Sequence, residues 1–211
     1  LPPHTAIGTD RLGIAGLTIA GWYKFHEKGL IDYKIGLVTG FVALVGSFLG
    51  ANLVMEISVA VLKKVVAIAT LGGLILVAVQ PNLGTDRRDH VITKREYGMG
   101  LVITFLVGVY GGFYGAMAGT FSLYVLLFVF KRTFLEGTAT LKISAFMMTT
   151  TAALVFASKG AIHYPMAAAM FSGCAIGSYF GAHYSDRIGN VWIRRIFIVM
   201  VLIMVIKLLI P

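Results

Sequence analysis

Hydrophobic residues run through this chain in long unbroken blocks, separated by short segments that carry most of the charge. The blocks do not alternate between apolar and polar positions, so the pattern favours helices over the strands of a membrane barrel. The chain is therefore predicted to be an all-α polytopic membrane protein. Its expected helices span residues 5–25, 35–55, 58–79, 99–130 (broken in the middle), 137–158, 163–182 and 191–209.

The block over residues 99–130 is the longest, and it contains no Asp, Glu, Lys, Arg or His. A straight helix of that length would measure about 48 Å, whereas the hydrocarbon core of a bilayer is roughly 30 Å thick. Gly111, Gly112, Gly115 and Gly119 gather near its middle and lower the helix propensity there. We expect two helices that meet at a glycine-rich break. Membranes tolerate such a break only inside protein or along a cavity.

Two parts of the chain match each other at a shift of 131 residues. KGLIDY at 28–33 falls on KGAIHY at 159–164, and GSFLGAN at 46–52 falls on GSYFGAH at 177–183. Repeats of this kind are common in secondary transporters. We predict two degenerate repeats, over residues 1–80 and 99–211, joined by a polar cytoplasmic linker over 81–98. Only the second repeat opens with a glycine-broken segment, so we expect the first to lack its equivalent helix pair.

The distribution of positive charge predicts how the repeats are oriented. If the segment 99–130 enters the membrane and returns on the same side, twelve Lys and Arg residues share one face, and only Lys63, Lys64 and Lys159 lie on the other. A single crossing would split the same charges almost evenly. The positive-inside rule favours the return, which makes the two repeats inverted.

Composition narrows the classes of function. Apolar residues make up 58% of the 211 and charged residues 13%, about half the charge of a typical soluble domain. The net charge of +9 lies in short loops, as expected for cytoplasmic loops beside anionic lipid rather than for a nucleic-acid surface. The single cysteine excludes an intramolecular disulfide. No metal-ligand spacing is present, so we expect neither a metal nor a cofactor.

The candidate chemistry is the binding of an anion. The helix that follows the break would present free N–H groups and the positive end of its dipole at mid-membrane. Arg11 and Lys142 occupy matching T-x-R/K triplets, and we expect both cations to reach towards the centre of the repeat. Close helix packing is the alternative explanation of the glycines, and interfacial anchoring that of the cations. The predicted substrate-binding residues are Gly111, Gly112, Gly115, Gly119, Thr120, Thr140, Lys142, Thr9 and Arg11.

Several of these motifs together resemble a known family. GVYGGFYGAMAGTF, EGTATLK, KGAIHY and GSYFGAHYSDRI are similar to the C-terminal half of the sulfite exporter TauE/SafE family of permeases. HTAIGTDR, KGLIDY and GSFLGANL resemble the same motifs in the N-terminal half of that family. The first glycine-rich helix of the family has no counterpart here. The resemblance implies transport of sulfur-containing anions such as sulfite and organosulfonates, and it does not select among them.

We therefore predict a multi-pass permease of the inner or plasma membrane that moves a small anion, sulfite or an organosulfonate, by alternating access. The alternative is a non-transporting membrane scaffold or a channel-like subunit. An enzyme would need an acid–base pair or metal ligands within the helices, and the sequence shows none. The expected partners are the anion and the lipid bilayer, without nucleic acid. The oligomeric state stays open, with a homodimer among the compatible states.

Overall fold

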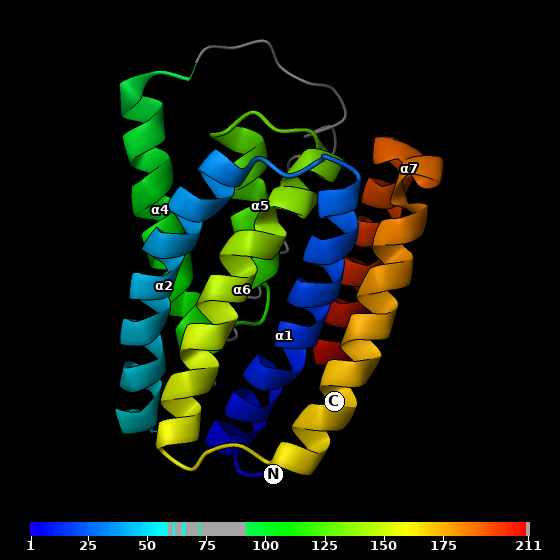
Figure 1. Cartoon of the computed structure of the whole chain (residues 1–211). Helices are drawn as coiled ribbons and strands as arrows, with labels where there is room; N and C mark the ends of the chain where they lie inside the picture. Colours follow the sequence, from blue (N-terminus) through cyan, green and yellow to red (C-terminus); the bar gives the residue numbers. More distant parts are fainter. Residues whose placement is uncertain (59–60, 62–64, 66–71, 73–91, 210–211) are drawn as a thin grey trace.

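The computed structural model describes residues 1–58, 61, 65, 72 and 92–209 (Figure 1). The elements of this part are all helices: α1 (Pro3–Glu27), α2 (Tyr33–Glu56), α4 (Lys94–Phe113), α5 (Ala118–Phe128), α6 (Phe134–Ser158) and α7 (Tyr164–Leu209). Among them α2, α4 and α6 are long and apolar enough to cross a membrane. The predicted all-α fold is confirmed for the described part. The helix expected over 58–79 and most of the linker 81–98 lie outside the described residues.

Capping side chains set where two of the helices begin. Thr93 and Glu96 form a capping box at the start of α4, and Thr133 and Glu136 form another at the start of α6. In each box the two side chains bond the free backbone N–H groups of the first turn. As a result α4 begins at Lys94, inside the segment assigned to the linker, and α6 begins three residues before the predicted position 137.

The last helix is interrupted by a kink. Gly189 has a φ of 75° and a ψ of 162°, which are not helical values and which favour glycine. Figure 1 shows the orange and red parts of α7 running in opposite directions on either side of this kink. The long element α7 is thus two helices, in agreement with the separate helices expected over 163–182 and 191–209.

Residue size separates the two faces of α2. Large side chains such as Phe41, Phe48 and Leu53 are exposed, whereas the buried positions are mostly glycine, alanine, serine and threonine. A Cβ atom at Gly50 would overlap the carbonyl of Val109, and one at Gly112 would overlap the carbonyl of Ser47. Helices α2 and α4 therefore pack with their backbones in contact, as helices in membranes commonly do.

The turns after α1 and α6 share one geometry. Gly29 and Gly160 follow these helices with φ values of 64° and 66°. The ends of α1 and α6 and the starts of α2 and α7 are each related by the shift of 131 residues. In Figure 1, α1 and α6 run in opposite directions. These relationships agree with the inverted repeat, which stays a prediction.

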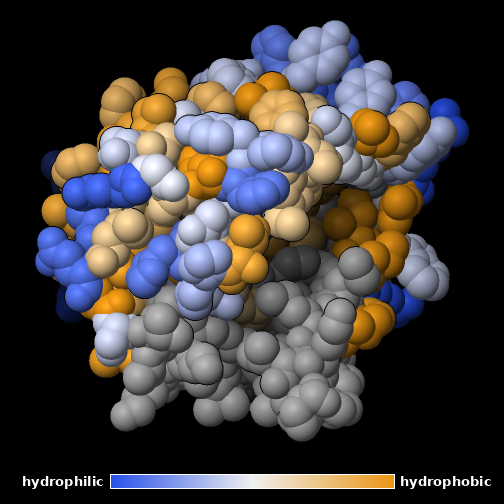
Figure 2. All heavy atoms as spheres, turned by 90° about the horizontal axis from the view of Figure 1, so that it is seen from below, coloured by the Kyte–Doolittle hydropathy of each residue, from blue (hydrophilic) through white to orange (hydrophobic). Residues whose placement is uncertain are grey.

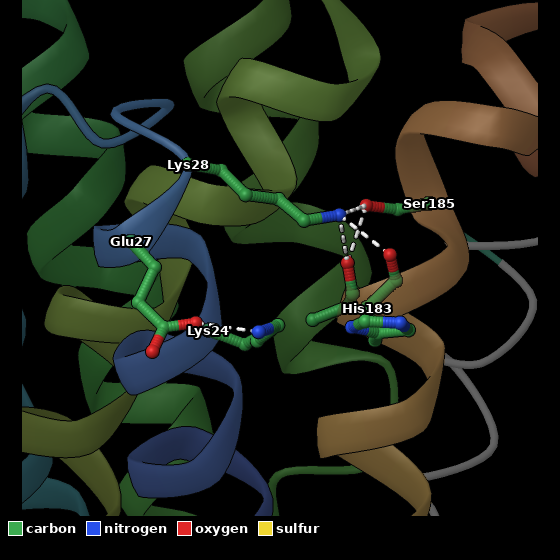
Figure 3. A network of polar contacts seen from close by, with 6 residues as sticks. Lys24, Glu27, Lys28, His183 and Ser185 are labelled. Atoms are coloured by element: carbon green, nitrogen blue, oxygen red, sulfur yellow. Dashed lines mark hydrogen bonds and ion pairs between the residues drawn. The ribbon is translucent and has the colours of Figure 1, made fainter.

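Polar contacts hold the end of α1 against α7. The Lys28 ammonium donates to the carbonyls of Ala182 and His183, at 2.6 and 2.8 Å, and lies 3.4 Å from the Ser185 hydroxyl (Figure 3). One turn earlier, Lys24 pairs with Glu27 of the same helix. This clamp contributes to the fixed position of α1, the helix that carries Arg11.

Candidate functional site

The predicted break is present and covers residues 114–117. Helix α4 ends at Phe113 and α5 begins at Ala118. Gly115 and Met117 within the break have φ values of 84° and 64°, in the left-handed region. These conformations turn the chain back on itself, and Figure 1 shows α4 and α5 both leading from the break to the same end of the molecule.

An ion pair joins the loops at that end. The Arg132 guanidinium, in the loop between α5 and α6, pairs with the Asp32 carboxylate, in the loop between α1 and α2. The two side chains are 20% and 25% exposed. The segment α4–α5 therefore returns to the end from which it came, which is the arrangement that the charge distribution favours.

Arg11 reaches from α1 to the break. Its side chain is 3% exposed, and its Nη2 donates to the Tyr114 carbonyl at 2.7 Å and to the Asp10 carboxylate at 2.9 Å. The Nε–H is buried and has no partner among the described residues. A Cβ atom at Gly115 would overlap the guanidinium, so the break fits around this cation only because residue 115 is glycine.

A half-open pocket of about 530 Å³ lies beside Arg11. One wall is the first part of α1, from Pro3 to Ile14, and the other is the break. Figure 2, which views the end of the molecule where the N-terminus lies, shows a face on which hydrophilic and hydrophobic residues mix and which is hollowed near its centre. The pocket thus combines apolar walls with a buried cation that has a donor to spare.

The start of α5 adds to the positive character of the pocket. Met117, which precedes the helix, lines the pocket and provides no side-chain cap. The first N–H groups of a helix have no partner within it, and they carry the positive end of the helix dipole. In α5 the first of them, that of Ala118, donates to the Gly115 carbonyl of the break at 3.0 Å, so the contribution to the pocket is that of the dipole. Arg11 and the α5 N-terminus both favour a bound anion.

The other predicted residues serve different contacts. Gly111 packs against Met148 and Gly112 against Ser47, which is the alternative explanation of these glycines. Thr120 is buried in the first turn of α5, and Gly119 there is exposed, with open space beside it. The hydroxyls of Thr9 and Thr140 accept backbone N–H groups instead of lying free for a ligand.

Lys142 lies away from Arg11. Its Cε lies 2.8 Å from the position that a Cβ atom of Gly21 would take, beside the Ser178 hydroxyl. Gly21 follows Arg11 by ten residues along α1, which corresponds to about 15 Å of helix. The structure therefore does not bring the two cations together, contrary to expectation, because Lys142 contacts α1 about three turns beyond Arg11.

Asp10 and two tyrosines were not among the predicted site residues. Asp10 lines the pocket, Tyr114 supplies the carbonyl for Arg11, and the Tyr110 hydroxyl is buried without a partner among the described residues. A signal was present for Asp10, because a carboxylate next to an arginine in an apolar helix is uncommon and needs a partner. Within the described residues, no group of His, Cys, Asp and Glu is arranged to hold a metal ion.

The known proteins that are similar to this chain are named as probable membrane transporters. The "Probable membrane transporter protein YdhB" of Bacillus subtilis is 24% identical over 195 residues, which cover 92% of this chain and 80% of that protein. A probable membrane transporter protein of Haemophilus influenzae is 26% identical over 99% of this chain and 81% of its own length. The probable membrane transporter protein YfcA of Escherichia coli K12 is 27% identical, with coverages of 99% and 77%.

No solved structure matches the chain significantly. The family model described as "Sulfite exporter TauE/SafE" matches residues 1–208, which is nearly the whole sequence. Together with the apolar helices and the glycine-rich break, this match shows that the chain is a membrane protein of the TauE/SafE sulfite exporter family.

Proposed function

We propose that this protein is a multi-pass permease of the cell membrane that carries a small anion, sulfite or an organosulfonate. The observation that carries the proposal is Arg11, a buried cation beside a pocket of about 530 Å³ whose Nε–H has no partner in the described part of the chain. The relatives are named as membrane transporters and the family as sulfite exporters, which supports transport rather than catalysis.

The chemistry of the site suits an oxyanion. A guanidinium presents its N–H groups in a planar fork that matches two oxygens of one anion, and hydrogen bonds to charged groups are stronger than neutral ones. Arg11 is also held at the break, where its Nη2 donates to the Tyr114 carbonyl, and the dipole of α5, which begins after the break, adds partial positive charge. The pocket has ample room for a sulfur centre with three oxygens and a short organic group.

The arrangement of the helices supports alternating access. The break between α4 and α5 resembles the interrupted helices at which many secondary transporters bind their substrates. The antiparallel course of α1 and α6 is what an inverted repeat requires. We propose that movement of one repeat against the other opens the pocket beside Arg11 to each side of the membrane in turn.

Flux measurements in proteoliposomes test this function. Uptake of labelled sulfite and of labelled ethanesulfonate is expected to saturate with concentration in the wild-type protein. Arg11→Ala should remove that uptake, and Arg11→Lys should restore part of it because the charge returns without the planar fork. Saturable flux that Arg11→Ala leaves unchanged would move the site elsewhere. Absence of saturable flux for both anions would favour a scaffold or a channel-like subunit.

A further inference from the structure

Asp10 lines the pocket directly beside the buried cation Arg11. Its carboxylate lies 2.9 Å from Nη2 of Arg11, and its side chain is 39% exposed whereas that of Arg11 is 3% exposed. Consecutive residues of a helix point about 100° apart, so the pair forms only because the long Arg11 side chain bends towards its neighbour. An anion that enters the pocket therefore meets Asp10 at the cation that it is to bind.

A second negative charge at Arg11 would conflict with this carboxylate. Like charges at contact distance repel strongly where water is scarce, and such pairs respond by binding a proton. Among the described residues, the other titratable groups near this part of α1 are Tyr110 and Tyr114, beside the guanidinium, and His163, whose backbone N–H bonds Thr9. His4 lies earlier on α1, where its Nε2 contacts the Val54 carbonyl. Lys142 contacts α1 ten residues away, at Gly21. None of these groups bonds the Asp10 carboxylate, whose partner within the described residues is Arg11.

We propose that Asp10 takes up one proton when an anion binds at Arg11, so that the anion and the proton are carried together. This inference rests on the proposed function of the same site. The proton comes from the solution that reaches the pocket and bonds one carboxylate oxygen of Asp10. The Nη2–H that Asp10 releases then donates to the anion, and no bond within the anion breaks.

The charge balance selects a class of anion. The empty site contains the cation Arg11 and the anion Asp10, so its net charge is zero. With neutral Asp10 and a monovalent anion the net charge is again zero, whereas a divalent anion leaves one uncompensated negative charge in a buried site. The site is therefore suited to an organosulfonate or to hydrogen sulfite, rather than to the sulfite dianion.

Calorimetry on the purified full chain in detergent tests the coupling. The probe is ethanesulfonate, titrated in two buffers with different enthalpies of ionisation, which together report the number of protons bound. We expect about one proton per anion at a pH where Asp10 is ionised, and an affinity that falls about tenfold per pH unit above that point. Asp10→Asn keeps the shape of the side chain without its charge, so it should bind the anion without proton uptake and independently of pH.

A second Asp→Asn variant serves as the matched control. Asp32 pairs with Arg132 in the loops at the end of the molecule to which α5 returns, so Asp32→Asn should retain both the proton uptake and the pH dependence. Binding that requires Arg11 but takes up no proton would overturn the inference and leave the proposed function standing. Proton uptake that persists in Asp10→Asn would also overturn the inference without contradicting the proposed function. Ethanesulfonate that fails to bind, or that binds equally well to Arg11→Ala, would contradict the proposed function itself.

Discussion

Thr9 and Thr140 make equivalent hydrogen bonds, each to the backbone N–H of a residue that precedes a helix in the other half of the molecule. The Thr9 hydroxyl accepts the backbone N–H of His163 at 2.9 Å, and the Thr140 hydroxyl accepts the backbone N–H of Asp32 at 3.0 Å. Both threonines are buried, with exposures of 1% and 0%. Asp32 and His163 each also bond an N–H group in the first turn of the helix that follows. Each threonine thus fixes the start of a helix in the other half of the molecule.

Replacing either threonine by valine should destabilise the protein. Valine keeps the shape but leaves the N–H of His163 or of Asp32 without its acceptor, at a cost of about 1–3 kcal/mol. We expect similar losses for Thr9→Val and Thr140→Val, measured as lower midpoints of thermal unfolding in detergent. The control is Thr138→Val, because the Thr138 hydroxyl donates to the Phe134 carbonyl of its own helix and, among the described residues, makes no bond to another helix. An equal loss in the control would show that the contacts between the halves carry no special weight.

Gly115→Ala should impair anion binding at Arg11. The new methyl group would overlap the guanidinium, and alanine at a φ of 84° adds a conformational cost of about 1–2 kcal/mol. We expect ethanesulfonate affinity to fall about tenfold or more, since 1.4 kcal/mol corresponds to a factor of ten. Gly173→Ala is the matched control, because Gly173 lies in α7 with open space around its Cβ position. If Gly115→Ala binds ethanesulfonate with unchanged affinity, the shape of the break is not required for anion binding.

The contact between α2 and α4 should tolerate no side chain at Gly112. An added Cβ would meet the backbone of Ser47, which cannot move aside as the end of a flexible side chain can. Overpacking of this kind costs about 1–3 kcal/mol. We expect Gly112→Ala to lower the unfolding midpoint, whereas Gly98→Ala, in the first turns of the same helix with open space around it, should not. Equal midpoints for the two variants would argue against the close packing.

Cysteine cross-linking can test the return of the α4–α5 segment. Asp32 and Arg132 form an ion pair through the long Arg132 side chain, so Asp32→Cys and Arg132→Cys should be joined by a bifunctional thiol reagent of about that length when Cys174 is replaced by serine. The matched control combines Arg132→Cys with Ser158→Cys, at the other end of α6, and this pair should not cross-link.

Labelling in intact cells tests the same return independently. A membrane-impermeant thiol reagent should label the single variants Asp32→Cys and Arg132→Cys from the same side of the membrane. Labelling from opposite sides would contradict the return.

The sequence predicts the helices and the break well, because both depend on local properties. Long apolar blocks give the helices, and the glycines clustered near Gly115 give the interruption between α4 and α5. The apolar block begins at Met99, five residues after the actual start of α4 at Lys94, because the capping box of Thr93 and Glu96 begins the helix within polar sequence. The ends of helices that are set by capping residues depend on single polar side chains, and a hydropathy pattern does not detect them.

The candidate site was predictable only in part. The sequence pointed to Arg11 and to the break, but their contact depends on how α1 packs against the other helices. Matching positions in the repeat also suggest a common centre for Arg11 and Lys142, whereas Lys142 contacts α1 at Gly21, about 15 Å along the helix from Arg11. Asp10 was missed because its ion pair requires the Arg11 side chain to bend back towards a neighbour that a helix places on another face.

The separation of small and large residues on α2 has a consequence for how mutations act on this fold. Both faces of the helix are largely apolar, so the polarity of its residues does not distinguish the buried face from the exposed face. Side-chain volume distinguishes the two faces. An exposed position such as Phe41 should accept any apolar residue, whereas a buried position such as Gly50 should accept only the smallest residue. In a saturation mutagenesis experiment, the rotational setting of α2 would be recovered from its tolerance to large side chains, because tolerance to apolar side chains in general would be nearly uniform around this helix.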